Sequence, residues 1–295
     1  MPVAFLGLGA IGAPMAAHLT STDRLTVWNR TRAKADAFAR EHSATVAATP
    51  KEAASGVTVL LTCLPTSAEV DAVLFGKDGA APALASGAIV IDCTSGDPAS
   101  SRRIAARLAE QGVAFVDAPV SGGVPAALKG ELTVMLGGES VAVERARTVV
   151  AAFGKTIVHL GPVGAGHAVK AVNNALLAAN ILAASEGLTA LVKAGIEPRL
   201  AVETINASSG ASFTTQVLVP ARVLNGSYPP LFRHALLDKD CGIAVELAAE
   251  MGVERPVLQA VKTRMAELRA ILGEAADYMD PFARAERSAG VEIRG

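Results

Sequence analysis

The chain has few of the residues that mark secreted, metal-binding or disulfide-rich proteins. Its 295 residues include 3 cysteines, 1 tryptophan and 2 tyrosines, and aromatic residues make up 4%. Because Cys63, Cys93 and Cys241 are far apart and odd in number, they predict neither a disulfide framework nor a metal site. They are typical of small apolar residues in a reducing compartment, and we expect a cytoplasmic protein.

Charged stretches and long apolar runs are also missing. The net charge is −1 with no basic stretch, so we expect no nucleic-acid partner. Apolar residues make up 51%, yet none of their uninterrupted runs reaches the length of about 18 that a membrane span needs, so we expect no membrane contact. The first residues lead directly into an apolar run, which leaves no room for a signal peptide. A length of 295 residues suits two domains.

Residues 1–160 alternate short apolar runs with helical stretches, which predicts a mainly parallel sheet covered by helices on both faces. The expected strands are Val3–Leu6, Leu25–Trp28, Val57–Thr62, Ala88–Asp92, Val113–Val116, Leu132–Leu136 and Thr156–His159. The expected helices include Ala10–Leu19, Thr31–Glu41, Ser67–Leu74, Pro98–Gln111 and Val141–Phe153. We therefore predict the α/β class, with a Rossmann-type dinucleotide-binding domain over residues 1–160.

Residues 161–295 show a different pattern, in which nearly all expected elements are helices. The loop Gly161–Gly166 is followed by a long apolar helical run, His167–Ala194, which other helices must bury. Further helices are expected at Pro198–Ala207, Thr214–Leu224, Leu236–Met251, Pro256–Leu272 and Phe282–Ala289, with one short strand at Val291–Ile293. We predict an all-α domain for substrate binding and oligomerisation. Its long helix is apolar around most of its circumference, which is more surface than a small domain can cover. We therefore expect a homodimer or homotetramer.

A glycine turn follows the first expected strand. Gly7, Gly9 and Gly12 are separated by Leu8, Ala10 and Ile11 in the pattern Gly-x-Gly-x-x-Gly, and an expected helix comes next. In a dinucleotide-binding turn the first glycine permits the tight turn and the second lets the backbone approach the pyrophosphate. The third allows close packing of helix and strand. The helix N-terminus then supplies N–H groups and positive dipole to the phosphates.

The end of the second expected strand indicates which dinucleotide is bound. NAD-binding domains usually place a carboxylate there, about 20 residues after the turn, to hold the ribose 2′-hydroxyl. This chain has Asn29, Arg30 and Thr31 instead. An amide, a guanidinium and a hydroxyl suit a 2′-phosphate, so we predict NADP(H) rather than NAD(H). At least one of the following Arg32 and Lys34 is expected only to decorate a solvated helix.

Four motifs together resemble the β-hydroxyacid dehydrogenases, and most closely their 3-hydroxyisobutyrate branch, over essentially the whole chain in order. They are the segment Phe5–Met15, the stretch Asp117–Gly123, the pattern Gly164-Ala165-Gly166-x-x-x-Lys170-x-x-x-Asn174, and the pair Lys239-Asp240. The resemblance implies oxidation of a small 3-hydroxy acid to its semialdehyde, with 3-hydroxyisobutyrate as the first choice and hence a place in valine catabolism. Tartronate semialdehyde, succinic semialdehyde and glyoxylate reduction stay open.

The resemblance also implies roles for individual residues. Lys170 would be the catalytic acid/base, and Asn174, one helical turn later, would hold the substrate against it. A free lysine has a pKa near 10.4, so Lys170 either loses its proton through burial or acts as a charged stabiliser of the oxyanion. Ser121, Gly122 and Gly123 resemble the loop that binds the substrate carboxylate, where a hydroxyl and glycine N–H groups converge.

The remaining implied contacts concern the cofactor. Leu64 and Pro65 resemble the loop over the adenosine side, and Thr94 resembles a neighbour of both the nicotinamide and the substrate. Lys239 resembles the lysine that reaches the cofactor from the helical domain. Asp240 is expected to be a structural partner.

Three other features carry further expectations. We expect His167 to satisfy local hydrogen bonds. Phe232 and the loop Asn206–Gly210 are candidates to line the substrate pocket.

Proteins of two other classes could carry the same glycine turn. A non-catalytic NADPH-binding module would be expected to lose Lys170 while keeping the glycine turn. Imine reductases resemble this fold but typically lack a lysine at this position. Because Lys170, Asn174 and the Ser121–Gly123 loop are all present, both alternatives are disfavoured.

Overall fold

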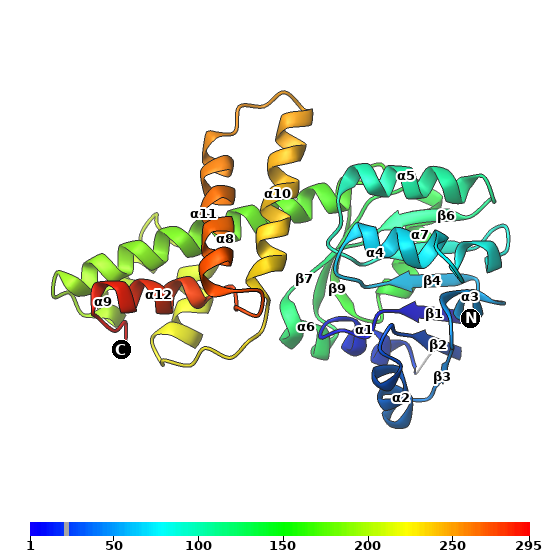
Figure 1. Ribbon diagram of the computed structural model, residues 1–295, viewed down its shortest axis with the longest axis horizontal. Helices are drawn as coiled ribbons and strands as arrows, with labels where there is room; N and C mark the ends of the chain where they lie inside the picture. The colour runs from blue at the N-terminus through cyan, green and yellow to red at the C-terminus, as the bar shows by residue number, and fades with distance from the viewer. Residues whose placement is uncertain (21–23) are drawn as a thin grey trace. The chain divides into compact units, whose positions relative to one another are not determined.

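The computed structural model describes residues 1–20 and 24–295. The chain divides into two compact units, Met1–Lys170 and Ala171–Gly295 (Figure 1).

The first unit is built on a six-stranded, fully parallel sheet. Its strands are β1 (Pro2–Leu6), β2 (Arg24–Trp28), β3 (Ala44–Val46), β4 (Val59–Thr62), β5 (Ile89–Asp92) and β6 (Ala114–Asp117). They lie in the order β3-β2-β1-β4-β5-β6. The order reverses between β1 and β4, and dinucleotides bind outside the carboxyl ends of the strands at such a switch point.

Helices cover both faces of this sheet (Figure 1). Neighbouring residues of a strand point to opposite faces, so Phe5 joins one core while Ala4 and Leu6 join the other. The first core also contains side chains of α1 (Gly12–Leu19), α2 (Arg32–Glu41) and α7 (Ser140–Val150). The second contains side chains of α3 (Pro50–Ala54), α4 (Ser67–Phe75) and α5 (Pro98–Ala109). The predicted Rossmann-type architecture is confirmed.

A second, three-stranded sheet was not expected. Its strands β7 (Val120–Ser121), β8 (Leu132–Leu136) and β9 (Gly154–His159) are ordered β7-β8-β9, with a helix, α6 (Gly123–Lys129), between the first two. The prediction that Leu132–Leu136 and Thr156–His159 belong to one mainly parallel sheet is wrong. The short return through α6 lets β8 pair antiparallel with β7, while β9 pairs parallel with β8.

A single helix, α8 (Ala165–Lys193), ends the first unit and begins the second. The second unit continues with α9 (Pro198–Asn206), the π-helical segment Thr214–Val223, α10 (His234–Glu250), α11 (Pro256–Leu272) and α12 (Asp280–Ala289). The prediction of a strand at Val291–Ile293 is wrong, because these residues form an irregular tail. The tail is held by the buried Ile293, whose N–H donates to Glu286 Oε1 at 2.7 Å.

The helix expected at Thr214–Leu224 is present but more widely wound than an α-helix. Leu224 N–H donates to the carbonyl of Val219, five residues back, at 3.0 Å. Pro220 lies inside this segment and has no N–H to donate, which removes one bond of a regular α-helix.

Helix α8 is long and apolar enough, by length and composition alone, to cross a membrane. This is weak support for a membrane segment, because the central helix of a helical core passes the same test. Its residues Ala178 and Ile181 are fully buried in the core of the second unit.

Candidate active site

The glycine turn after β1 has the geometry of a phosphate cradle. Gly7 has φ +108°, and a Cβ there would lie 2.3 Å from the carbonyl oxygen of Cys63. A Cβ at Gly12 would lie 2.0 Å from the carbonyl oxygen of Gly7. Gly9 is exposed, and a Cβ there would meet nothing within 4 Å. Two glycines are therefore required by packing, whereas the third leaves open space beside the N-terminus of α1, which fits a bound pyrophosphate.

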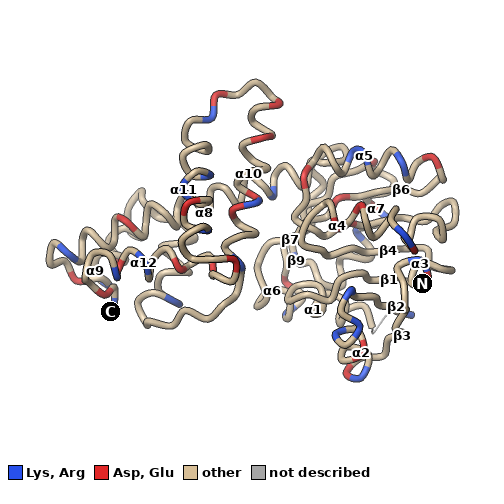
Figure 2. The backbone as a smooth tube through the Cα atoms, in the orientation of Figure 1, with Lys and Arg blue, Asp and Glu red and all other residues tan. Residues whose placement is uncertain are grey.

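The end of β2 is tied to this turn. Leu8 N–H donates to Asn29 Oδ1 at 3.0 Å, and Asn29 Nδ2 donates to the carbonyl of Thr31 at 3.0 Å. Arg30 follows in an exposed position just before α2, a helix that carries both basic and acidic residues (Figure 2). Arg32 instead pairs with Asp36 at 2.8 Å on α2, so it is the basic side chain expected to decorate the helix.

The loops after β4 and β5 are joined by one buried carboxylate. Asp92 Oδ1 accepts from Thr62 Oγ1 at 2.7 Å and from Thr94 N–H at 3.1 Å. Thr94 Oγ1 in turn accepts from Leu64 N–H at 3.1 Å, and Thr94 is 1% exposed. The structure thus brings together Thr94 and the Leu64–Pro65 loop, two segments that are 30 residues apart. Direct contact of Thr94 with cofactor or substrate stays a prediction.

The Ser121–Gly123 loop exposes its glycines. Ser121 ends β7, and Gly123 begins α6. Gly122 has φ +130° and Gly123 has φ +68°, values that other residues rarely adopt. A Cβ at Gly122 would also lie 2.6 Å from that of Ala126. The loop therefore requires glycines, and its backbone is accessible.

Helix α8 begins against a buried aspartate at the end of β6. Asp117 Oδ1 accepts from Gly164 N–H at 2.7 Å, and Asp117 Oδ2 accepts from His167 N–H at 2.9 Å. Gly166 packs so tightly that a Cβ would lie 2.2 Å from the carbonyl oxygen of Met135. Burial raises the pKa of Asp117. The nearby His167 and the N–H donors lower this pKa, but the effect of burial is larger. Lys170 follows one turn later and is 8% exposed.

In the helical unit, Asn174 and Lys239 share one carboxylate. Asp240 Oδ2 accepts from Asn174 Nδ2 at 2.6 Å, while Asp240 Oδ1 lies 3.0 Å from Lys239 Nζ. Asn173 Nδ2 donates to Asn174 Oδ1 at 3.0 Å. Asp240 is thus the structural partner that the sequence predicted, and it orients the amide of Asn174.

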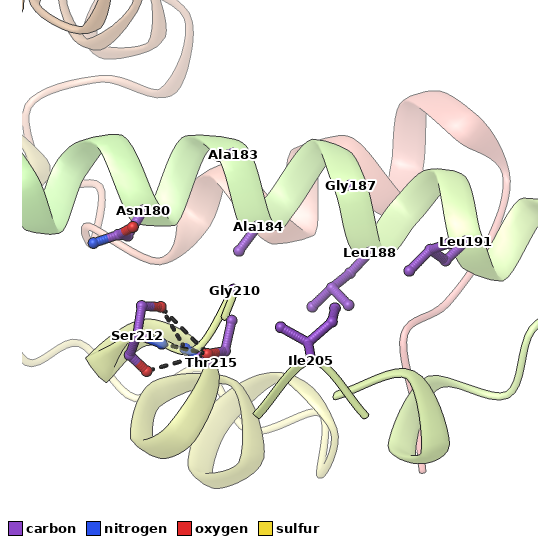
Figure 3. A pocket seen from close by; sticks show the side chains of 10 residues that line it. All are labelled: Asn180, Ala183, Ala184, Gly187, Leu188, Leu191, Ile205, Gly210, Ser212 and Thr215. Carbon is purple, nitrogen blue, oxygen red and sulfur yellow. Dashed lines mark hydrogen bonds between the residues drawn. The ribbon is translucent and has the colours of Figure 1, made fainter. Parts of the chain in front are cut away.

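The structure places the expected lining residues of the helical unit in two different settings. Gly210, from the loop Asn206–Gly210, borders an open groove of about 380 Å³ within this unit. Figure 3 shows it between α8 and the Ser212–Thr215 turn. The side chains lining it are Asn180, Ala183, Ala184, Leu188, Leu191, Ile205, Ser212 and Thr215, together with Gly187 and Gly210. Because none of these residues is an acid or a base, the groove lacks the groups needed for proton transfer.

Phe232 is partly buried and packs against Tyr278 of the helical core, with ring centroids 5.7 Å apart. Contact of this ring with a substrate stays a prediction.

The thiols of Cys63 and Cys241 are held in their neutral form. Burial, followed by Asp92, raises the pKa of the Cys63 thiol to about 12, and burial raises that of Cys241 to about 12. Neither thiol is therefore a nucleophile near neutral pH. In residues 1–20 and 24–295, there is no cluster of three His, Cys, Asp or Glu side chains that could hold a metal ion.

Sequence reasoning underestimated the polar ends of three neighbouring strands. Thr62, Asp92 and Asp117 are the last residues of β4, β5 and β6, and they are direct neighbours in the sheet register. A polar residue closing each of three buried apolar runs was the available signal. His167 was expected to bond locally, which is wrong, because its ring lies 2.7 Å from Ser101 Oγ, 66 residues away.

Comparison with known families covers nearly the whole chain. Residues 2–161 match the family described as the NAD binding domain of 6-phosphogluconate dehydrogenase. Residues 164–283 match the family described as the NAD-binding part of NADP-dependent 3-hydroxyisobutyrate dehydrogenase. The fold, the cradle and these matches define an NAD(P)-binding dehydrogenase that acts on a CH–OH donor.

Individual relatives are similar along almost their full length. The chain is 33% identical to 2-(hydroxymethyl)glutarate dehydrogenase of Eubacterium barkeri, covering 99% of this chain and 97% of the relative. It is 35% identical to NAD-dependent L-serine dehydrogenase of Pseudomonas aeruginosa, covering 86% and 88%. The structure of Mycobacterium tuberculosis 3-hydroxyisobutyrate dehydrogenase with L-serine has a TM-score of 0.86 at 28% identity, covering 96% and 98%. The chain belongs to the β-hydroxyacid dehydrogenase family and is similar to 3-hydroxyisobutyrate dehydrogenase.

Proposed function

We propose that this protein interconverts a small 3-hydroxy acid and its semialdehyde with NADP(H), and that 3-hydroxyisobutyrate and methylmalonate semialdehyde are the pair. The observation that carries the proposal is the buried Lys170 at the end of the unit that holds the glycine cradle. Burial disfavours the charged form of a lysine, which would let it accept a proton from a hydroxyl. If the lysine keeps its charge, burial strengthens the electrostatic stabilisation that it gives to a developing oxyanion.

The bound nicotinamide would supply the acceptor or the donor of the hydride. In oxidation, Lys170 Nζ takes the proton of the substrate hydroxyl as the C–O bond becomes a carbonyl. In reduction, the same atom returns a proton to the developing alkoxide. Asn174, which Asp240 orients, would hold the substrate oxygen, and Lys239, which also lies beside Asp240, would hold the cofactor.

The substrate carboxylate would bind at the loop after β7. The hydroxyl of Ser121 and the N–H groups of Gly122 and Gly123 are suitable donors, because neither glycine carries a side chain that could obstruct an anion. The pyrophosphate would lie along Gly7–Gly12, with Leu64 and Pro65 on the adenosine side. Thr94 would act by holding that loop and bordering the nicotinamide.

The test is a set of initial rates with the purified protein, NADP or NAD, and a panel of substrates. The panel contains 3-hydroxyisobutyrate, L-serine, 2-(hydroxymethyl)glutarate, glyoxylate and the semialdehydes of tartronate and succinate. The highest kcat/KM for 3-hydroxyisobutyrate with NADP is the expected result. A higher value for another member would retain the mechanism and change the substrate, whereas no turnover at all would overturn the proposal.

The choice of NADP rests on Arg30, which follows Asn29 and precedes Thr31 at the end of β2. Replacing Arg30 by alanine should raise KM for NADP by about 10- to 100-fold, because hydrogen bonds to a charged phosphate are among the strong ones. KM for NAD should stay within about twofold, because NAD has no 2′-phosphate. Arg32→Ala is the matched control, since Asp36 already holds that side chain. Better turnover of NAD than NADP by the unaltered protein would contradict this reading.

We also propose that the protein is a cytoplasmic homodimer or homotetramer. The open groove beside α8 is lined mainly by Ala183, Ala184, Leu188 and Leu191, an apolar surface that a second copy would cover. Light scattering during size-exclusion chromatography should give two or four times the mass of the chain. A stable monomer at micromolar concentration would refute this proposal.

A further inference from the structure

His167 has its side chain fully enclosed at the start of α8, one turn before Lys170. Its exposed fraction is 0%, and its Nδ1 lies 2.7 Å from Ser101 Oγ on α5. Its other ring nitrogen, Nε2, lies 3.9 Å from Asp92 Oδ2 at the end of β5. The ring therefore faces two elements that are remote in the sequence and belong to the same unit.

The hydrogen bonds of Ser101 assign the proton on Nδ1. Ser101 Oγ lies 3.0 Å from the carbonyl oxygen of Asp97, which can only accept, so the single hydroxyl hydrogen is used there. Ser101 Oγ must then accept from His167, and Nδ1 is the donor. With this ring orientation Nε2 lies 3.9 Å from Asp92 Oδ2, which is too long for a hydrogen bond, so the bond to Ser101 is the one that orients the ring.

The backbone of the same turn is fixed independently. The Asp117 carboxylate accepts from the N–H groups of Gly164 and His167, and Gly166 has no space for a side chain against Met135. The backbone is thus bound to β6 and β8, while the imidazole binds α5 and faces β5. Residues three apart on a helix share one face, so the side chains of His167 and Lys170 lie on the same buried side.

We propose that the His167 side chain is a positioning residue for Lys170: its hydrogen bond to Ser101 fixes the rotation of the first turn of α8 relative to α5 and to the carboxyl ends of β5 and β6. The inference rests on the proposed acid/base role of Lys170. Asp117 holds the backbone of this turn, and His167 sets which way its buried face points. Small errors in the placement of an acid/base group lower the rate of the chemical step more than they lower binding.

The experiment compares His167→Leu, His167→Gln and Ser101→Ala with the unaltered protein. His167→Leu should lower kcat by about tenfold or more, while KM and the affinity for NADPH change by less than about threefold. His167→Gln should recover most of the loss, because its amide N–H can still donate to Ser101. Ser101→Ala should lower kcat in the unaltered background and have no further effect in His167→Leu. His42→Leu, at the end of α2, is the control for the same substitution at another histidine, and it should leave kcat unchanged.

A second readout needs no substrate. Limiting acetic anhydride labels lysines in proportion to their reactivity, and peptide mass spectrometry gives the labelling of Lys170 relative to Lys193, the last residue of the same helix. This ratio should change in His167→Leu and return toward the original value in His167→Gln. If no member of the substrate panel is turned over, the proposed function fails, and the labelling ratio still decides the role of His167.

Two results would overturn the proposal. One is a lower melting temperature of His167→Leu with unchanged kcat per folded molecule and an unchanged labelling ratio, which would make His167 merely structural. The other is a loss of kcat that His167→Gln shares in full, because the bond to Ser101 would then not be the link.

Discussion

Replacing Lys170 by alanine is expected to lower kcat by about 10²- to 10⁴-fold, the range that a positioned acid/base contributes. The substitution removes the group that would exchange a proton with the substrate oxygen and leaves the glycine cradle intact. NADPH affinity, measured by fluorescence titration, and the melting temperature should therefore stay close to those of the unaltered protein.

Lys193→Ala is the matched control for this substitution. Lys193 lies on the same helix but ends it, and its Nζ donates to the carbonyl of Ala289 at 3.1 Å. Its loss should leave kcat unchanged. If Lys170→Ala retained more than about a tenth of the original kcat, the general acid/base assignment would be wrong.

The second large effect is expected at Gly9. A methyl group there meets no protein atom within 4 Å, and Gly9 does not adopt a positive φ, so Gly9→Ala should fold as stably as the unaltered protein. The same methyl group would occupy the space through which the pyrophosphate approaches the backbone. Affinity for NADPH should fall by about 10- to 100-fold, the cost of losing one hydrogen bond to a charged group.

Gly7→Ala provides the contrast. Its positive φ and the Cys63 carbonyl 2.3 Å from the added Cβ predict a loss of stability of about 1–3 kcal/mol together with the loss of binding. Gly187→Ala, at an open helical position that borders the groove beside α8, should leave NADPH binding unchanged. Unchanged NADPH affinity in Gly9→Ala would show that the turn does not hold the pyrophosphate.

Local patterns determined most of the first unit. Apolar runs such as Val3–Leu6 and Leu25–Trp28 became strands within a residue of their expected ends, because short buried strands are set by the sequence itself. The spacing of Gly7, Gly9 and Gly12 likewise predicted the turn, since close packing at two of these positions tolerates no Cβ. The roles predicted for Lys170 and Asn174 come from a resemblance of motifs, which carries information that periodicity lacks.

Long-range partners were decided only by the tertiary structure. The sequence could not show that Asp117 would cap α8, because the residues it joins are 47 and 50 positions away. Nor could it show that β8 would leave the parallel sheet to pair with the two-residue strand β7. His167, expected to bond locally, instead faces α5 and β5.

The sequence by itself therefore determined the class of protein and the glycine turn, whereas the reactive roles of Lys170 and Asn174 stay predictions. Those features depend on neighbouring residues, whose geometry the peptide backbone and its side chains fix over a few positions. The tertiary structure alone decided which buried carboxylate holds which segment. These pairings join residues that are tens of positions apart in the sequence. They form only once the core has brought the segments together, because buried polar groups must then find hydrogen-bond partners.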